Sequence, residues 1–356
     1  MKALKLAVFV LFAVACAKEG NNSSTASSTS SSSGSVDLTG AGATFPYPLY
    51  SKWFDEYAKA TGVRINYQSI GSGGGIRQLS EGTVDFGASD SPMSDAELAK
   101  AKFGPILHIP TVLGAVVITY NLPVMSVPLE LTPQAIADIF AGRITKWNDA
   151  RIASLNPAVS LPASDILVVH RSDGSGTTYI FTDYLTTAAP SWKSIGKGKE
   201  VNWPVGLGAK GNEGVAGQVK QTPGAIGYVE LAYAKQNRLP IAAVKNKAGK
   251  FVIASVPAVT AAAAGVARTL PANTDFRISV ADAPGADAYP ISSFTWILVY
   301  QHQSDTVKGK KLVAFLNWAL TNGEAEAPSL DYAPLPTEMT PRVKAKVAAI
   351  DFTGAK

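Results

Sequence analysis

Short apolar runs that lead into glycine- and serine-rich turns recur along the chain, and apolar residues at helical spacing follow the turns. The clearest case lies between residues 166 and 185. The uncharged run at 166–169 predicts a buried strand, and the apolar residues at 179–185 predict a helix that begins at about Ser175. A strand, a turn and a helix start therefore follow one another directly.

Three earlier segments repeat this order of strand, turn and helix. Their predicted strands lie at 36–39, 63–68 and 84–89, and the polar residues that follow them are Thr44, Ser72 and Asp90. Ligands of open α/β sheets bind outside the carboxyl ends of the strands. The pattern therefore predicts an α/β fold in which the four strand ends face one ligand site.

The rest of the chain adds elements of both kinds. The uncharged run at 111–120 predicts a fully buried strand, and Thr132 followed by Pro133 is typical of a helix start. Further strands are expected at 225–229 and 290–300, a short helix near Trp147, and longer helices at 48–60, 133–140, 259–267, 305–321 and 341–350.

The turn before Ser175 offers donors to an anion. Arg171 carries a permanent charge on a planar fork of N–H groups, and Ser175 and Thr177 add hydroxyls. The helix start adds unpaired backbone N–H groups and a partial positive charge. Gly174 and Gly176 let the backbone approach a ligand closely. An ordinary capped helix after a glycine turn explains the same residues equally well.

Asp90 is the acidic residue among these donor-rich strand ends. A carboxylate repels an anion unless the ligand has a proton to donate, and phosphate keeps one near neutral pH whereas sulfate has none. With sulfate, a buried acceptor would stay unpaired at a cost of about 1–3 kcal/mol or more. Asp90 thus favours phosphate. An equally good explanation of Asp90 is that it caps the next helix or pairs with a nearby arginine.

Length and charge limit the function classes. The 356 residues leave room for two domains, and 46% hydrophobic residues indicate a sizeable core. The formal net charge is +5, and about +3 would remain if Lys2 and Lys5 were removed with a leader. Because no run of Lys and Arg forms a basic stripe, no nucleic-acid partner is expected.

The N-terminus has the pattern of an export signal. Basic residues precede a short apolar run, which predicts a signal peptide at 1–15. Cys16 follows it as the only cysteine and is a candidate lipidation site; its alternative is an incidental cysteine in a discarded leader. Residues 16–35 are serine-rich and predict a flexible tether. We expect an extracytoplasmic protein attached to a membrane through Cys16.

The possible catalytic and cofactor-binding motifs lack the neighbouring residues or elements that such sites need. The glycines at 206–211 spell a dinucleotide motif, but Pro204 interrupts the strand that this motif needs. The three histidines have no metal-ligand spacing. Ser175 lacks the glycine pattern of a nucleophile elbow and has no evident base. We therefore predict no metal, no cofactor and no enzymatic activity.

Four of these motifs together resemble one family. The segments Gly40-Ala41-Gly42-Ala43-Thr44-Phe45-Pro46, Gly71-Ser72-Gly73-Gly74-Gly75, Val84-Asp85-Phe86-Gly87-Ala88-Ser89-Asp90 and Arg171-Ser172-Asp173-Gly174-Ser175-Gly176-Thr177 are similar to the phosphate-binding protein of the ABC-type phosphate importer. The resemblance extends over residues 38–335. It implies that phosphate is held by Ala43, Thr44, Phe45, Ser72, Asp90, Arg171, Ser175, Gly176 and Thr177, and that Asp173 pairs with Arg171.

The same resemblance implies a fold and a partner. The expected fold is α/β, with the two lobes and two crossovers of a type II-like periplasmic-binding-protein fold and the ligand in the cleft between them. Lobe I would comprise 36–120 and 290–356, and lobe II 121–289. The expected function is to deliver inorganic phosphate, as a monomer, to a membrane ABC permease and ATPase complex. The alternatives are a receptor for arsenate or, less in keeping with Asp90, sulfate or molybdate, and a secreted phosphatase or hydrolase that uses Ser175.

Overall fold

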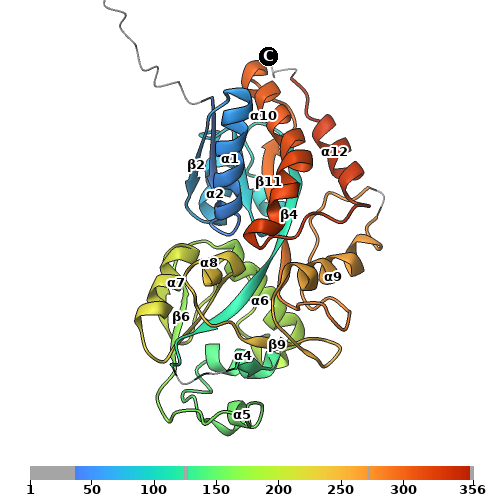
Figure 1. Cartoon of the computed structure of the whole chain (residues 1–356). Coiled ribbons are helices and arrows are strands. Elements are labelled where there is room, and N and C mark those ends of the chain that lie inside the picture. The colour runs from blue at the N-terminus through green and yellow to red at the C-terminus, as the bar shows by residue number, and fades with distance from the viewer. Residues whose placement is uncertain (1–36, 124, 126, 272, 353–356) are drawn as a thin grey trace, which may run out of the picture. The chain divides into compact units, whose positions relative to one another are not determined.

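Strands and helices alternate along the chain, as its hydrophobic pattern predicts (Figure 1). The expected signal peptide, Cys16 and the serine-rich tether lie outside the described residues. The computed structural model describes residues 37–123, 125, 127–271 and 273–352.

The bounds of the elements agree closely with the turns that the sequence marks. The strands are β1 (Leu38–Gly42), β2 (Ile65–Ser69), β3 (Phe86–Ser89), β4 (Ile106–Tyr120), β5 (Glu130–Leu131), β6 (Leu167–Arg171), β7 (Leu207–Ala209), β8 (Ala225–Glu230), β9 (Ala243–Lys245), β10 (Phe251–Val252) and β11 (Ser292–Tyr300). The helices are α1 (Tyr47–Thr61), α2 (Ser72–Glu81), α3 (Asp95–Leu98), α4 (Pro133–Phe140), α5 (Ala150–Ala153), α6 (Gly176–Ala188), α7 (Gly211–Gln221), α8 (Leu231–Gln236), α9 (Val256–Ala267), α10 (Thr306–Trp318), α11 (Glu324–Glu326) and α12 (Thr340–Ala348). Shorter helical turns are η1 (Pro190–Trp192), η2 (Ala319–Gly323) and η3 (Ala327–Leu330).

Two groups of strands share one mixed sheet. Within the described residues, eight strands lie in the order β2-β1-β3-β11-β4-β8-β6-β7, and three short ones form a second sheet, β10-β9-β5. β1 runs parallel to β2 and β3, and β6 runs parallel to β7 and β8. Within each group, the carboxyl ends of the parallel strands therefore lie at the same edge of the sheet, and the predicted site residues follow these ends. The predicted α/β class is confirmed.

The long strand β4 joins the two groups (Figure 1). Its residues from Ile106 to Ala115 pair with β11, and those from Val116 to Tyr120 pair with β8. The chain thus passes from one group to the other inside a strand, close to the first crossover that the sequence places at residue 120. The exact lobe boundaries stay a prediction.

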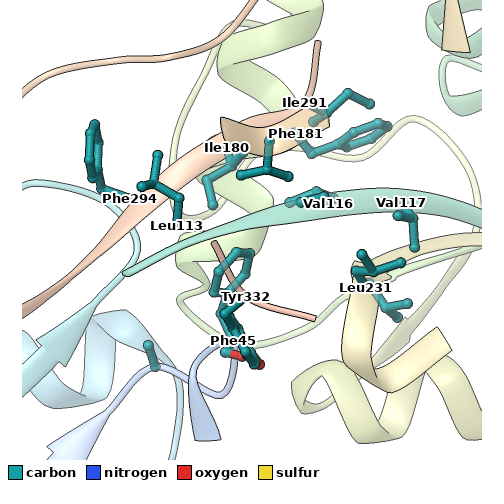
Figure 2. Packing of buried hydrophobic residues seen from close by; sticks show 14 of the residues in the cluster. Phe45, Leu113, Val116, Val117, Ile180, Phe181, Leu231, Ile291, Phe294 and Tyr332 are labelled. Atoms are coloured by element: carbon teal, nitrogen blue, oxygen red, sulfur yellow. The ribbon is translucent and has the colours of Figure 1, made fainter. Parts of the chain in front are cut away.

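The core is built around β4. All 15 of its residues are buried, which explains the uncharged run in the sequence. Leu113 lies opposite Phe294 of β11, and the N–H of Val116 donates to the carbonyl of Ile291 (Figure 2). β4 therefore lies in the core of both strand groups.

Local signals set the helix ends where the sequence predicts them. The Thr132 hydroxyl accepts from the N–H of Ala135 at the start of α4. Ser94 and Glu97 form a reciprocal capping box at α3. Gly62 ends α1 at φ 79°, a left-handed conformation that glycine adopts without strain.

Short elements differ from the sequence-based expectation. β4 begins at Ile106 rather than at residue 111, because the preceding apolar residues also pair with β11. The helix expected around Trp147 is only the single turn α5, since the Trp147 indole is instead buried and donates to the Gly224 carbonyl. β5, β9 and β10 have two or three residues each, too few for a periodic signal.

Candidate ligand site at the strand ends

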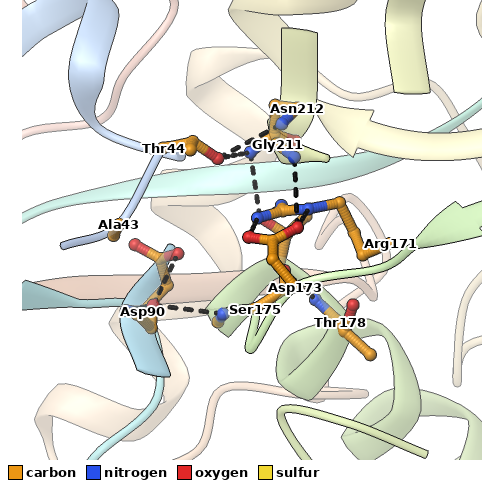
Figure 3. Close-up of polar contacts among 12 residues, drawn as sticks. Ala43, Thr44, Asp90, Arg171, Asp173, Ser175, Thr178, Gly211 and Asn212 are labelled. Atoms are coloured by element: carbon orange, nitrogen blue, oxygen red, sulfur yellow. Dashed lines mark hydrogen bonds and ion pairs between the residues drawn. The ribbon is translucent and has the colours of Figure 1, made fainter. Parts of the chain in front are cut away.

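The segment 171–177, which we call the Arg171 turn, has the predicted local structure. β6 ends at Arg171, and Ser175 caps α6 by accepting from the N–H of Thr178 at 3.0 Å. The Arg171 side chain is 1% exposed and meets Asp173 through two hydrogen bonds, Nε to Oδ1 at 2.7 Å and Nη2 to Oδ2 at 2.5 Å (Figure 3). The implied pairing of these two residues is therefore present.

Asp173 holds the guanidinium in one orientation. Its Oδ1 also accepts from the N–H of Gly211 at 3.1 Å. Burial by itself raises the pKa of Asp173, but the hydrogen bonds and charge of Arg171 outweigh burial and keep the pKa below its usual value. The remaining guanidinium nitrogen, Nη1, lies 3.3 Å from the Thr177 hydroxyl. Arg171 is thus fixed beside the first turn of α6.

The segment 43–45, which we call the Thr44 loop, is held by three tyrosines. Three consecutive carbonyls accept from tyrosine hydroxyls: Ala43 from Tyr67 at 2.8 Å, Thr44 from Tyr233 at 2.6 Å and Phe45 from Tyr332 at 2.7 Å. In a planar trans peptide the N–H points away from the C=O. Binding of the Ala43 and Thr44 carbonyls therefore directs the N–H groups of Thr44 and Phe45 to the opposite side.

Ala43 differs from its two neighbours. Its N–H donates to the carbonyl of Ala88 at 2.9 Å, and its own carbonyl is bound by Tyr67. Both backbone groups are thus used inside the fold. Among the described residues, nothing accepts from the N–H of Thr44 or Phe45. Of the three loop residues, these two can offer backbone donors.

Ser72 and Asp90 form the adjoining part of the site. Ser72 is the first residue of α2, and its Oγ accepts from the N–H groups of Asp90 at 3.2 Å and Gly176 at 3.1 Å. Asp90 directly follows β3 and is 1% exposed; its Oδ1 accepts from the Thr295 hydroxyl at 2.9 Å. Burial raises its pKa to about 7, although Thr295, the charge of Arg171 and Ser72 each lower it.

Contacts between the two strand groups close the site. The N–H of Gly73 donates to the Gly174 carbonyl at 2.8 Å, beside the contact between Gly176 and Ser72. A Cβ on Gly176 would come within 2.4 Å of the Ser72 Oγ and 2.5 Å of Asp90 Oδ2. Glycine is required here because α6 and Asp90 approach too closely for any side chain.

The chain is similar to known proteins over most of its length. A family model described as a PBP superfamily domain matches residues 23–322. A phosphate-binding protein PstS from Xylella fastidiosa strain Temecula1 is 45% identical over 313 residues, 87% of this chain and 85% of that protein. Another from Methanocaldococcus jannaschii is 38% identical over 342 residues, 90% of this chain and 87% of that protein. The chain belongs to the PstS family of the PBP superfamily.

A solved structure supports the fold. The crystal structure of a phosphate binding protein from Stenotrophomonas maltophilia matches with a TM-score of 0.70 at 23% identity, over 88% of this chain and 94% of that one. The expected two-lobed α/β fold of this family is confirmed.

Asn212 is a site residue that the sequence analysis missed. Its Nδ2 donates to the hydroxyls of Thr44 at 2.8 Å and Thr177 at 3.0 Å, and its Oδ1 accepts from the N–H of Glu230 at 2.8 Å (Figure 3). It thereby links the Thr44 loop to the Arg171 turn. Asn212 lies in the first turn of α7, directly after the glycine-rich segment 206–211 that was rejected as a dinucleotide motif. β7 and α7 repeat the order of strand, turn and helix seen at the other site residues.

The histidines have structural partners. His170 stacks on Trp203 with ring centroids 4.9 Å apart, and the His108 Nε2 accepts from the N–H of Met93 at 3.0 Å. Burial lowers the pKa of His108 to about 4, so this ring is neutral. Within residues 37–352 as described, no three His, Cys, Asp or Glu side chains are grouped to hold a metal ion. No helix in that part of the chain is long and apolar enough to cross a bilayer.

Proposed function

We propose that the protein binds inorganic phosphate between the Arg171 turn and the Thr44 loop and delivers it to an ABC permease. The observation that carries this proposal is the position of Asp90. It is a buried carboxylate whose neighbours at the site are donors: the Arg171 guanidinium, the Ser72 hydroxyl and the start of α6. One acceptor among donors matches a tetrahedral oxyanion that retains one proton.

The donors come from both sides. The N–H groups of Thr44 and Phe45 would bind from one strand group, together with the Ser72 hydroxyl once its proton turns from Asp90 to the ligand. Arg171, the Ser175 hydroxyl and the first N–H groups of α6 would bind from the other. Ser175 caps α6 as an acceptor, so its own proton is free to donate. The helix start adds a partial positive charge at the same place.

Asp90 would select phosphate over sulfate because phosphate carries a proton and sulfate does not. Because burial raises its pKa to about 7, near neutral pH the pair of Asp90 and hydrogen phosphate shares a proton at little cost. Sulfate has no proton, so it would leave an ionised Asp90 facing a second acceptor. Arsenate carries a proton as phosphate does and is the ligand that this site would distinguish least.

The transport role follows from the family. The relatives are named as phosphate-binding proteins, and the fold is that of two lobes that hold a ligand between them. We infer an extracytoplasmic monomer, attached to a membrane through Cys16 and the segment 16–35. Lobe I (36–120 and 290–356) and lobe II (121–289) would close on phosphate by a hinge near the two crossovers.

A titration tests the binding function. Phosphate and sulfate are titrated separately into the protein by calorimetry at about pH 9, about two units above the pKa of about 7 that burial gives Asp90, and hydrolysis of a phosphate monoester is assayed in parallel. We expect phosphate to bind and sulfate to bind at least about 100-fold more weakly, with no release of phosphate from the ester. Sulfate that binds as tightly as phosphate, or turnover of the ester through Ser175, would overturn the proposal.

A further inference from the structure

One of the tyrosines that bind the Thr44 loop makes two contacts, which a single proton can serve only as a shared, weaker bond. The Tyr332 hydroxyl lies 2.7 Å from the Phe45 carbonyl oxygen and 3.0 Å from Oε2 of Glu230. A phenol has one proton to donate. The Phe45 carbonyl has no proton of its own, so the short contact to it requires the Tyr332 proton. For the second contact to be a full hydrogen bond, Glu230 must supply its proton.

The surroundings of Glu230 favour a neutral side chain. Glu230 ends β8 and is fully buried, and within the described residues its Oε1 has no hydrogen-bond partner. A charged carboxylate without partners for one oxygen is costly in such a place. Its Oε2 also accepts from the N–H of Ala232 at 2.8 Å, which a carboxylic acid oxygen can do while donating its proton.

The nearby titratable groups act in the same direction. Asp331 and Asp90 are both acidic, and they disfavour a charge on Glu230; Tyr233 and Tyr332 are neutral neighbours. Burial is the largest cause that raises the pKa of Glu230 well above its usual range, and the hydrogen bonds from Ala232 and Tyr332 only partly oppose it.

We propose that Glu230 is a carboxylic acid in the folded protein and donates its proton to the Tyr332 oxygen, so that the Tyr332 proton is committed to the Phe45 carbonyl. Glu230 is then a positioning residue: it does not contact the Thr44 loop itself but acts on the loop through Tyr332. The proton chain runs from Glu230 through Tyr332 to Phe45 and anchors the end of the loop that enters α1.

The neutral state also matters for charge, a point that rests on the phosphate-binding function proposed above. An ionised Glu230 would add a second carboxylate near Asp90 and would repel the anion at the site. It would also compete with the Phe45 carbonyl for the Tyr332 proton. A protonated Glu230 avoids both effects.

Infrared spectroscopy tests the protonation directly. Spectra of wild type and Glu230→Gln are compared at a pH well above 7, where Asp90 and Glu324, whose pKa values burial raises to about 7, are ionised. We expect a carboxylic acid carbonyl band in the wild-type spectrum that is absent from that of Glu230→Gln. Equal spectra in this region would overturn the proposal, whatever the protein binds.

Phosphate titrations test the positioning role. Tyr332→Phe and Glu230→Leu each remove one link of the chain, and we expect each to weaken phosphate binding by about 3- to 10-fold. Glu230→Gln keeps a neutral donor toward Tyr332 and should bind phosphate more tightly than Glu230→Leu. If glutamine rescues nothing, Glu230 is not a donor. If wild type itself does not bind phosphate, the proposed function fails, and the infrared result still decides the state of Glu230.

Discussion

The Arg171 turn and the Thr44 loop face the same site but are held in different ways. Inside the Arg171 turn, Arg171 pairs with Asp173 two residues on, and Ser175 caps the N–H three residues on. The three carbonyls of the Thr44 loop are bound by tyrosines that lie 24, 189 and 287 residues away in sequence. The pairing of charge and the helix cap of the first region come from its own residues, whereas the carbonyls of the second are bound only in the completed fold.

This difference predicts how each region responds to substitution. If phosphate binds as proposed, loss of the charge of Arg171 removes a direct contact to the anion and leaves the partly buried Asp173 without its partner. Loss of one tyrosine hydroxyl leaves the Thr44 loop with two other attachments and no uncompensated charge. Effects on phosphate binding should therefore be large for the first region and small for the second.

Arg171→Gln should have the largest effect. The change removes the cation from the site and leaves the partly buried Asp173 without its partner, so phosphate binding should weaken by roughly 100-fold or more. Calorimetric titration of phosphate measures this. Lys146→Gln is the matched control, because Lys146 is 56% exposed in its ion pair with Asp165 and lies away from the site. Equal affinities of the two variants would refute the role of Arg171.

The same contrast explains what the sequence reveals. Residues at the start of a helix that follows a strand, such as Ser72 and Ser175, and the nearby Arg171 can be predicted, because strand, turn and helix signals are local. Their α/β context was also predictable, since β4 and β11 are buried strands rich in β-branched and aromatic residues. Tyr233 and Tyr332 had no such signal. From the sequence, a buried tyrosine cannot be told from any other core residue. The partner of its hydroxyl is set only when distant parts of the chain come together.

Asn212 and Thr295 were hidden for related reasons. Asn212 follows a turn whose glycines suggested another motif, and the three residues of β7 give little periodic pattern. Thr295 lies inside the buried strand β11, where its hydroxyl donates to Asp90 at 2.9 Å. A β-branched residue in an apolar strand is ordinary, so nothing in the pattern marks it as a partner of the site.

Asp90→Asn should change selectivity more than affinity. The amide can donate to a fully deprotonated anion, so the preference for phosphate over sulfate should fall by roughly 10- to 100-fold. Paired titrations of phosphate and sulfate at about pH 8 to 9, where Asp90 is ionised, give this ratio for wild type and variant. An unchanged ratio would mean that Asp90 does not read the proton of the ligand.

The pH dependence sharpens this prediction. Sulfate fits the wild-type site only while Asp90 carries its proton, and the pKa of Asp90 is about 7. Sulfate affinity should therefore be highest below that pH and fall by about tenfold per pH unit above it. Phosphate brings its own proton and should depend on pH less steeply. In Asp90→Asn the steep fall with sulfate should disappear.

Tyr233→Phe should have the smallest effect and thereby marks the difference between the two regions. The Tyr233 hydroxyl donates to the Thr44 carbonyl at 2.6 Å. Its loss frees the peptide group between Thr44 and Phe45, whose N–H faces the opposite side. Phosphate affinity should fall by about 3- to 10-fold, and the phosphate-to-sulfate ratio should stay unchanged. Tyr120→Phe is the control, because the Tyr120 hydroxyl accepts from the N–H of Leu129 away from the site. A loss as large as that of Arg171→Gln would show that the Thr44 loop, though assembled from distant residues, carries as much of the binding energy as the charged turn.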